Sequence, residues 1–333
     1  MPARFRRVAS LHARRTAVDD GGAPVAYGEL AARADGVAAA LVARGVTLGA
    51  PVVLLLEQGV WNIVATLGVL LAGAAYAPLD PADPPAHLAR LADLLAAPLV
   101  LADAATAGRA AALGSPAREV VLVDRIAPAS AAPHVPVGPD ALASVYFTSG
   151  TTGGAKGVMD SHANLLDNAA RYTGTLRIGP QDRLSLVQSP AFSGAASSMF
   201  AALLNGATLV PIPVAGARLA DVAAAIRTRR VTVYHSVPSL LRSIVAVDGG
   251  TFPDVRVVRL EGDRAAPADA VLHRRHFPAG SVLANGLGTT ETGLCRQLRL
   301  RTGDPIPEGV LPVGGPVPGV EVAVVDDGGA RLP

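Results

Sequence analysis

Lysine is almost missing from this sequence. Lys156 is the single lysine among 29 lysine and arginine residues in a chain of 333. Arginine can replace lysine at most surface positions, but not where a compact and flexible ammonium group is required. The retained Lys156 is therefore a candidate functional residue before any motif is considered.

The net charge is also small, and cysteine is rare. The chain has 27 acidic residues and a net charge of +2, which gives little electrostatic reason to expect a nucleic-acid partner. Its one cysteine, Cys295, excludes a disulfide within the chain and a zinc site made of several thiolates. With 50% hydrophobic and 17% charged residues, the composition predicts a large buried core and argues against disorder.

No long run has the pattern of a membrane span or an export signal. Residues 63–79 are the most apolar, but they contain glycines and end in Leu79-Asp80-Pro81, so we interpret them as a buried helix followed by a strand. Residues 1–15 are rich in arginine and lack the apolar core of a signal peptide. We therefore expect a soluble, cytoplasmic protein with no membrane partner.

Short apolar runs alternate with helix-like segments along the chain, which is typical of an α/β fold with mostly parallel sheets. Residues 127–139 are rich in proline and alanine and are interpreted as a linker. The expected helices are 61–71, 87–95, 162–172, 197–204, 219–229, 239–247 and 267–273. The expected strands are 52–56, 75–79, 99–102, 119–123, 143–147, 184–187, 208–211, 231–234, 255–260 and 281–284, with a small β unit starting at 320–325.

The strongest motif is the glycine- and hydroxyl-rich segment 146–158, which joins an expected strand to an expected helix. Its glycines allow a tight backbone, and its amides and hydroxyls can align on phosphate oxygens. Lys156 would add a positive charge. The segment is not a Walker loop, because Ala155 precedes the lysine and Gly157 follows it. A polar surface loop is the alternative interpretation.

This segment resembles the phosphate loop of the adenylate-forming superfamily, which includes acyl-CoA synthetases, luciferases and peptide-synthetase adenylation domains. Other segments resemble the superfamily in the same order: 26–30, 71–81, 285–292 and 313–319. Segment 71–81 is most similar to the peptide-synthetase branch. The resemblance covers essentially the whole chain, and several motifs in order are far more specific than one.

The resemblance implies the large N-terminal domain of such an enzyme, an α/β fold with two mostly parallel sheets and flanking helices in five layers. It implies a first subdomain at 1–140, a second at 141–310 with the phosphate loop and acyl pocket, and the start of a small β subdomain at 311–333. The family's C-terminal lid, with its catalytic lysine, would follow residue 333. We therefore expect an N-terminal part that adenylates poorly by itself.

The implied activity is that of an ATP-dependent acid–thiol ligase. A carboxylate attacks the α-phosphate of ATP, which gives an acyl-adenylate and pyrophosphate. The acyl group then passes to the phosphopantetheine thiol of a carrier protein, as in natural-product biosynthesis. One alternative is an acyl- or aryl-CoA ligase that uses coenzyme A as the acceptor. Another is a catalytically inactive binding domain that retains the fold.

The resemblance also assigns roles around the nucleotide. Lys156, Thr290 and Glu291 would be catalytic, with Thr290 contacting the α-phosphate and Glu291 helping to hold Mg²⁺. A polar loop is the alternative reading of Thr290-Glu291. The β- and γ-phosphates would lie on the loop from Thr148 to Gly157, which includes Ser149, Gly150, Thr151, Thr152 and Gly153. The adenine would lie against Gly262, Asp263, Asn285, Gly286, Leu287 and Gly288, with Asn285 facing its amino group.

The acyl pocket departs from the superfamily's amino-acid-activating pattern at Ser193. Members that activate α-amino acids have an aspartate there, which binds the substrate ammonium. A neutral hydroxyl loses most of that charge-assisted stabilisation, so we expect a small polar acid rather than a standard α-amino acid. The implied pocket residues are Phe192, Ser193, Gly194, Ser197, His235, Arg259, Glu261, Gly286, Leu294 and Cys295.

Arg259 and Glu261 are two residues apart on an expected strand, so both side chains lie on one face. Buried charges need partners. Either the two pair with each other, or Glu261 binds a displaced amine or Arg259 binds a second acidic group of the substrate. His235 is interpreted as a satisfied core histidine and Cys295 as a wall residue, because no base is evident beside the thiol.

Overall fold

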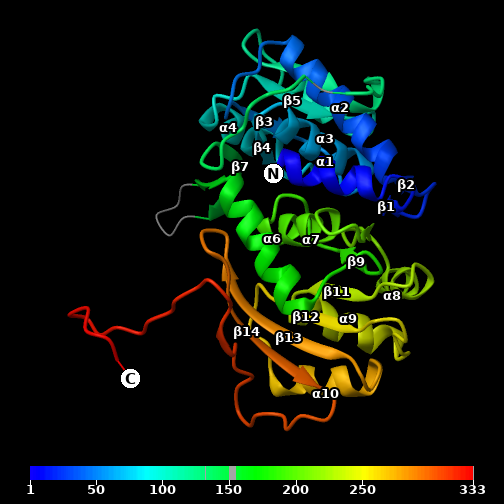
Figure 1. Ribbon diagram of the computed structural model, residues 1–333, viewed down its shortest axis with the longest axis vertical. Helices are drawn as coiled ribbons and strands as arrows, with labels where there is room; N and C mark the ends of the chain where they lie inside the picture. The colour runs from blue at the N-terminus through cyan, green and yellow to red at the C-terminus, as the bar shows by residue number, and fades with distance from the viewer. Residues whose placement is uncertain (132, 150–154, 333) are drawn as a thin grey trace.

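A computed structural model describes residues 1–131, 133–149 and 155–332. Within them the strands form one sheet of six and one of nine. In Figure 1 the smaller sheet lies in the upper half of the molecule and most strands of the larger sheet lie in the lower half, with helix α6 (His162–Leu176) between them. The predicted α/β class with two sheets is confirmed.

The smaller sheet consists of β3 (Pro51–Leu54), β4 (Ala75–Pro78), β5 (Leu99–Ala102), β6 (Glu119–Leu122), β7 (Leu142–Ser149) and β8 (Ala155–Ser161). Their order is β6-β5-β3-β4-β7-β8. Neighbouring strands are parallel except for the antiparallel hairpin β7–β8. β7 and β8 contain the two described ends of the segment that resembles a phosphate loop.

The larger sheet consists of β1 (Thr16–Val18), β2 (Val25–Ala26), β9 (Arg183–Leu186), β10 (Thr208–Pro211), β11 (Val233–Ser236), β12 (Val257–Leu260), β13 (Val282–Thr289), β14 (Gly293–Arg301) and β15 (Gly315–Pro316). Their order is β15-β14-β13-β12-β11-β9-β10-β1-β2. Between β13 and β1 in this spatial order, all neighbouring strands are parallel. Strand β2 at one edge, and strands β14 and β15 at the other edge, are antiparallel to their neighbours.

Successive side chains of a strand point to opposite faces of its sheet, and helices pack against both faces. In β12, Val257 packs into the cluster between the sheets, whereas Val258 packs into the cluster on the outer face. In β5, Leu101 and Val100 divide in the same way. The described residues therefore form the predicted five layers: helix, sheet, helix, sheet, helix.

The helices of the middle layer are α1 (Pro2–Leu11), α2 (Tyr27–Ala43), α3 (Val60–Leu71), α6 and α7 (Ser193–Leu203), whose apolar residues share one cluster. The outer layers contain α4 (Pro85–Leu94) and α5 (Ala107–Ala111) on the smaller sheet, and α8 (Leu219–Thr228), α9 (Pro238–Asp248) and α10 (Pro267–His276) on the larger one. Helix α6 begins directly after β8, where the Ser161 side chain accepts a hydrogen bond from the Asn164 amide at 3.2 Å.

Sheet membership does not follow the expected subdomain ranges. β7 and β8 lie after residue 140 but belong to the smaller sheet, whereas β1 and β2 lie near the N-terminus and join the larger one. An apolar pattern identifies a strand but not its neighbour, so position along the chain is a poor guide to sheet membership. The ranges 1–140, 141–310 and 311–333 stay predictions as domain boundaries.

Two further expectations concern the chain's end and the membrane. In 320–325 the structure places no named strand, only an isolated antiparallel bridge between Val325 and Arg331. Across the described ranges, every helix is too short or too polar to cross a bilayer.

Candidate functional site

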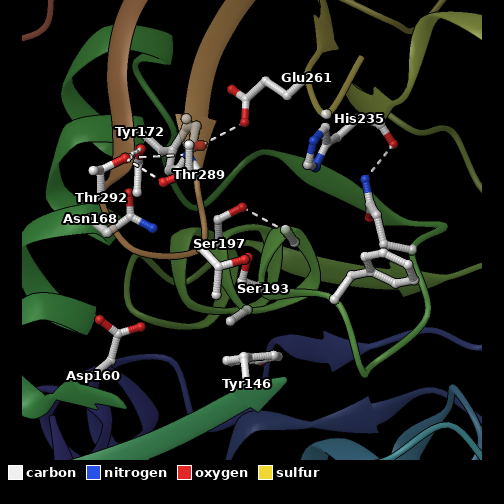
Figure 2. A pocket seen from close by; sticks show the side chains of 18 of the residues that line it. Tyr146, Asp160, Asn168, Tyr172, Ser193, Ser197, His235, Glu261, Thr289 and Thr292 are labelled. Carbon is white, nitrogen blue, oxygen red and sulfur yellow. Dashed lines mark hydrogen bonds between the residues drawn. The ribbon is translucent and has the colours of Figure 1, made fainter. Parts of the chain in front are cut away.

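A cavity of about 610 Å³ lies between the two sheets, bounded by α6, α7 and the turn between β13 and β14. Its size is in the range of small-molecule sites. Figure 2 shows Glu261 and His235 on one side, Tyr146 and Asp160 on the opposite side, and Ser193 and Ser197 between them. Ten of the predicted site residues line it: Phe192, Ser193, Gly194, Ser197, His235, Glu261, Gly262, Gly288, Thr290 and Glu291.

The β7–β8 hairpin turns one face toward this cavity. Thr148 pairs with Lys156, and Tyr146 pairs with Val158, so these four side chains share a face. Tyr146 lines the cavity. Thr148 and Lys156 therefore lie on the cavity-facing side of the hairpin, farther along it, and Lys156 is exposed. Ser149 ends β7, whereas the predicted phosphate ligands Gly150, Thr151, Thr152 and Gly153 lie outside the described residues.

The turn between β13 and β14 places Thr290 and Glu291 at the cavity. The hydroxyl oxygens of Thr289 and Thr292 lie 3.0 Å apart across the turn. A Cβ on Gly288 would lie 2.6 Å from the Gly293 carbonyl oxygen, so the strands can close here only around a glycine. Glu291 lies exposed on this turn and lines the cavity.

Ser193 begins α7 and faces this turn. Its hydroxyl oxygen lies 3.1 Å from that of Thr290. The residue before it, Phe192, is 68% exposed and also lines the cavity. Two neutral hydroxyls therefore meet at the position where the resemblance predicts an aspartate in members that activate α-amino acids.

Arg259 and Glu261 form a buried, bidentate ion pair at the end of β12. The guanidinium donates from Nε to Glu261 Oε1 at 2.8 Å and from Nη2 to Oε2 at 2.7 Å. Tyr172 donates a third hydrogen bond to Oε2 at 2.7 Å, and its ring centroid lies 3.5 Å from Arg259 Cζ. The expectation that both charges share one face is confirmed, and they pair with each other.

His235 also lines this side of the cavity, and Gly286 lies behind Glu261 on the adjacent strand. A Cβ on Gly286 would lie 2.4 Å from Glu261 Oε1, so a larger residue would displace the carboxylate. His235 is buried, and its Nδ1 lies 2.8 Å from Ser198 Oγ. Burial, together with the charge of Arg259, lowers the pKa of His235 well below its usual value, so the ring is neutral at physiological pH. The interpretation of a satisfied histidine agrees with this contact.

Several predicted residues lie outside the cavity lining. Asn285 is buried and donates to the carbonyls of Leu311 and Pro312, at 3.4 and 2.9 Å, instead of facing an open site. Arg259 lies behind Glu261 and is 2% exposed. The others outside the lining are Thr148, Lys156, Asp263, Gly286, Leu287, Leu294 and Cys295, and their roles stay predictions.

Polar and charged residues to which the sequence assigned no role also line the cavity, among them Tyr146, Asp160, Asn168, Arg171 and Tyr172. Strand alternation alone could have identified Asp160, because it lies four residues after Lys156 on the same face. Burial raises the pKa of the Asp160 carboxyl above its usual range, and a hydrogen bond from Asn164 at 3.3 Å opposes this. Tyr172 and Asn168 carry no local signal, because their partners are distant in sequence.

The predicted magnesium ligand is compatible with its surroundings. Mg²⁺ with a nucleotide usually binds one or two carboxylates and the phosphates, and keeps several waters. In the described ranges no three His, Cys, Asp or Glu side chains gather as a protein-only metal site. Glu291 is exposed at the cavity and forms no ion pair with the residues that the structure describes, so its carboxylate is accessible to a Mg²⁺ ion whose other ligands are phosphates and water.

Known proteins resemble this chain over nearly its whole length. A family model described as AMP-binding enzyme matches residues 5–333. The chain is 34% identical to phosphinothricin tripeptide synthetase PhsC of Streptomyces viridochromogenes, over 96% of this chain and 29% of that protein. It is 31% identical to the L-proline–[L-prolyl-carrier protein] ligase of Streptomyces coelicolor, over 98% of this chain and 66% of that protein.

A solved structure shares the fold closely. The AMPPNP-bound form of the nonribosomal peptide synthetase FmoA3 superposes with a TM-score of 0.91 at 29% identity, over 99% of this chain and 36% of that one. The chain thus spans between 29% and 66% of the length of the two curated relatives.

Proposed function

Because the chain belongs to the AMP-binding enzyme family, we propose that its cavity holds ATP and a carboxylic acid together and forms an acyl-adenylate. The observation that carries this proposal is the convergence of three segments on one cavity. The β7–β8 hairpin offers Lys156 on its cavity-facing side, the β13–β14 turn offers Thr290 and Glu291, and α7 begins at Ser193. Positioning and charge neutralisation are what phosphoryl chemistry requires of a protein.

The roles follow from where each group lies. Lys156 and the loop beside it neutralise the β- and γ-phosphates. Thr290 contacts the α-phosphate beside the acid that attacks it. Glu291 holds Mg²⁺, which, when bound, draws charge from the phosphate oxygens. The FmoA3 structure, which has the same fold, is an AMPPNP-bound form, and this supports ATP as the nucleotide.

The acid is a small polar molecule rather than a standard α-amino acid. Ser193 and Thr290 meet through neutral hydroxyls at 3.1 Å, which gives an α-ammonium no carboxylate to pair with at this point. Transfer then goes to the phosphopantetheine thiol of a carrier protein. The name of the Streptomyces coelicolor relative includes a carrier protein as its acceptor, which supports this choice over coenzyme A.

A stable mimic of the product tests the proposal. An acyl-sulfamoyl adenosine joins the acid and the nucleoside in one molecule, and a cavity that forms an acyl-adenylate should bind it at least about a hundredfold more tightly than AMP or the acid alone. Calorimetric titration measures the three affinities. A mimic that binds no better than AMP would mean that acid and nucleotide do not share the cavity, as expected of an inactive binding domain.

A further inference from the structure

Tyr172, Ser197 and Glu261 form one wall of the cavity, called here the Glu261 wall. Both hydroxyl groups of this wall already donate their protons in hydrogen bonds within the protein. The Tyr172 hydroxyl donates to Glu261 Oε2 at 2.7 Å. The Ser197 hydroxyl donates to the Gly194 carbonyl at 2.7 Å. A hydroxyl has one proton, so neither group can donate a second hydrogen bond to a ligand in this arrangement.

Arg259 cannot supply the missing donor. It is 2% exposed and lies behind the wall, outside the cavity lining. Its Nε and Nη2 atoms donate to Glu261, and Nη2 also donates to Ser197 Oγ at 2.8 Å. A second carboxylate on the substrate would therefore find no free cation at this wall and would lose its hydration.

A full ammonium is also poorly matched. Glu261 lines the cavity, but its charge is neutralised by two hydrogen bonds from Arg259 at 2.8 and 2.7 Å. The pair has no net charge, so an ammonium would lose hydration without gaining a free anion.

Acceptor capacity remains on the same wall. A carboxylate oxygen accepts about two hydrogen bonds, and Glu261 Oε1 receives one, from Arg259 Nε. Ser197 Oγ receives one from Arg259 Nη2, and Ser197 also lines the cavity. The wall therefore offers acceptors without a net charge.

We propose that the acid bound here presents a neutral hydrogen-bond donor, a hydroxyl or an uncharged N–H, to Glu261 and places no second full charge against this wall. Arg259 acts as a positioning residue, because it fixes the carboxylate and neutralises it without touching the ligand. This inference rests on the proposed function only in taking the ligand to be a carboxylic acid.

Matched acids test the inference. The probes are 4-hydroxybutanoate, 4-methoxybutanoate and 4-aminobutanoate, and the 3- and 4-substituted benzoates with hydroxyl, methoxy or aminomethyl groups. Ligand-observed NMR measures their affinities for the 333-residue chain without nucleotide, so the result does not depend on ATP. We expect the best hydroxy acid to bind about tenfold more tightly than its methoxy and ammonium counterparts.

Two variants test the role of the pair. Arg259→Met leaves Glu261 charged, so the affinity ratio of ammonium to hydroxy acid should rise by about tenfold or more. Tyr172→Phe keeps an aromatic ring over Arg259 and frees an acceptor on Glu261, so the hydroxyl preference should persist. Arg256→Met is the matched control, because Arg256 makes a similar bidentate pair with Asp182, at 2.7 Å for both bonds, outside the cavity. It should leave the ratio unchanged.

The outcomes divide clearly. Wild-type protein that binds methoxy or ammonium acids as well as hydroxy acids, or binds none of the panel, overturns the inference. So does a folded Arg259→Met variant with an unchanged ratio. If circular dichroism shows that Arg259→Met is unfolded, the wild-type and Tyr172→Phe ratios decide. Failure of the acyl-sulfamoyl adenosine to bind would overturn the proposed function instead.

Discussion

Two glutamates line the same cavity, and the protein holds them in different ways. Glu261 receives two hydrogen bonds from Arg259 and one from Tyr172, and 11% of its side chain is exposed. Glu291 lies exposed on the β13–β14 turn and forms no ion pair within the part of the chain that the structure describes. The first carboxylate has a fixed position and its charge is balanced by Arg259, whereas the second has no ion-pair partner among the described residues and can attract a cation.

The contrast follows from local structure. Glu261 directly follows a buried parallel strand, where an unpaired charge would be costly, and its partner Arg259 lies two residues earlier on the same face. Glu291 lies on a solvent-facing turn, where water supports the charge. Fixed geometry suits the discrimination of substrates, and an accessible charge suits a metal that arrives with its nucleotide.

The largest expected effect is on stability. Arg259→Met leaves Glu261 charged and buried without its partner, so it should lower the free energy of unfolding by about 3–5 kcal/mol. Arg256→Met removes a pair whose arginine is 39% exposed, so the loss should be clearly smaller. Urea denaturation measures both. Equal losses would remove the distinction drawn for the Glu261 pair.

Gly286→Ala disturbs the paired glutamate from the adjacent strand. The new Cβ would lie 2.4 Å from Glu261 Oε1, so the carboxylate must move. We expect the free energy of unfolding to fall by about 1–3 kcal/mol and acid affinity to fall with it. Gly280→Ala is the control, because no heavy atom lies within 4 Å of the position that its new Cβ would take. Denaturation and NMR titration check the pair of variants, and an unaffected acid affinity in Gly286→Ala would contradict the arrangement.

Glu291→Gln tests the exposed glutamate. Removing its charge should weaken Mg·ATP binding by about tenfold, because one charge-assisted contact to the metal is lost, and should leave metal-free ATP binding and protein stability nearly unchanged. Calorimetry with and without Mg²⁺ separates these effects. Equal weakening in both conditions would mean that Glu291 does not act through the metal.

Much of this fold could be predicted from sequence, because continuous apolar runs mark buried parallel strands. The expected bounds of β5 and β10 agree with the structure. Strands β8 and β14 were not expected, because Lys156 and Gly157 in one, and Arg296 and Arg299 in the other, interrupt the apolar pattern. Their hairpin partners, rather than their own composition, keep them extended.

The sequence likewise identifies some residues of the site and misses others. Motif positions identified Ser193, Thr290 and Glu261, and strand alternation predicted that Arg259 and Glu261 share a face. The third member of that cluster, Tyr172, lies 89 positions from Glu261, so no local pattern connects them. The expected role of Asn285 depended on an open adenine site, whereas its side chain bonds to carbonyls of the later segment 311–312.

The smallest expected effect concerns pH. His235 has a pKa lowered by burial, and burial lowers the pKa of His273 to about 4. Both rings stay neutral in the folded protein at about pH 6, so acid affinity should be flat between about pH 6 and 8. Unfolded histidines bind protons near about pH 6.5, so stability should fall as pH drops from about 6.5 toward 4. Rising stability over that window would contradict these assignments.

The most direct test of the central claim is a calorimetric titration of Mg·ATP into wild-type protein, Lys156→Met and Met159→Ala. Lys156 lies on the cavity-facing side of the β7–β8 hairpin, whereas Met159 lies on the other face and is 68% exposed. We predict saturable binding by the wild type, weakening by about tenfold or more in Lys156→Met, and no change in Met159→Ala. Equal affinity for all three proteins would contradict the claim that this hairpin holds the phosphates.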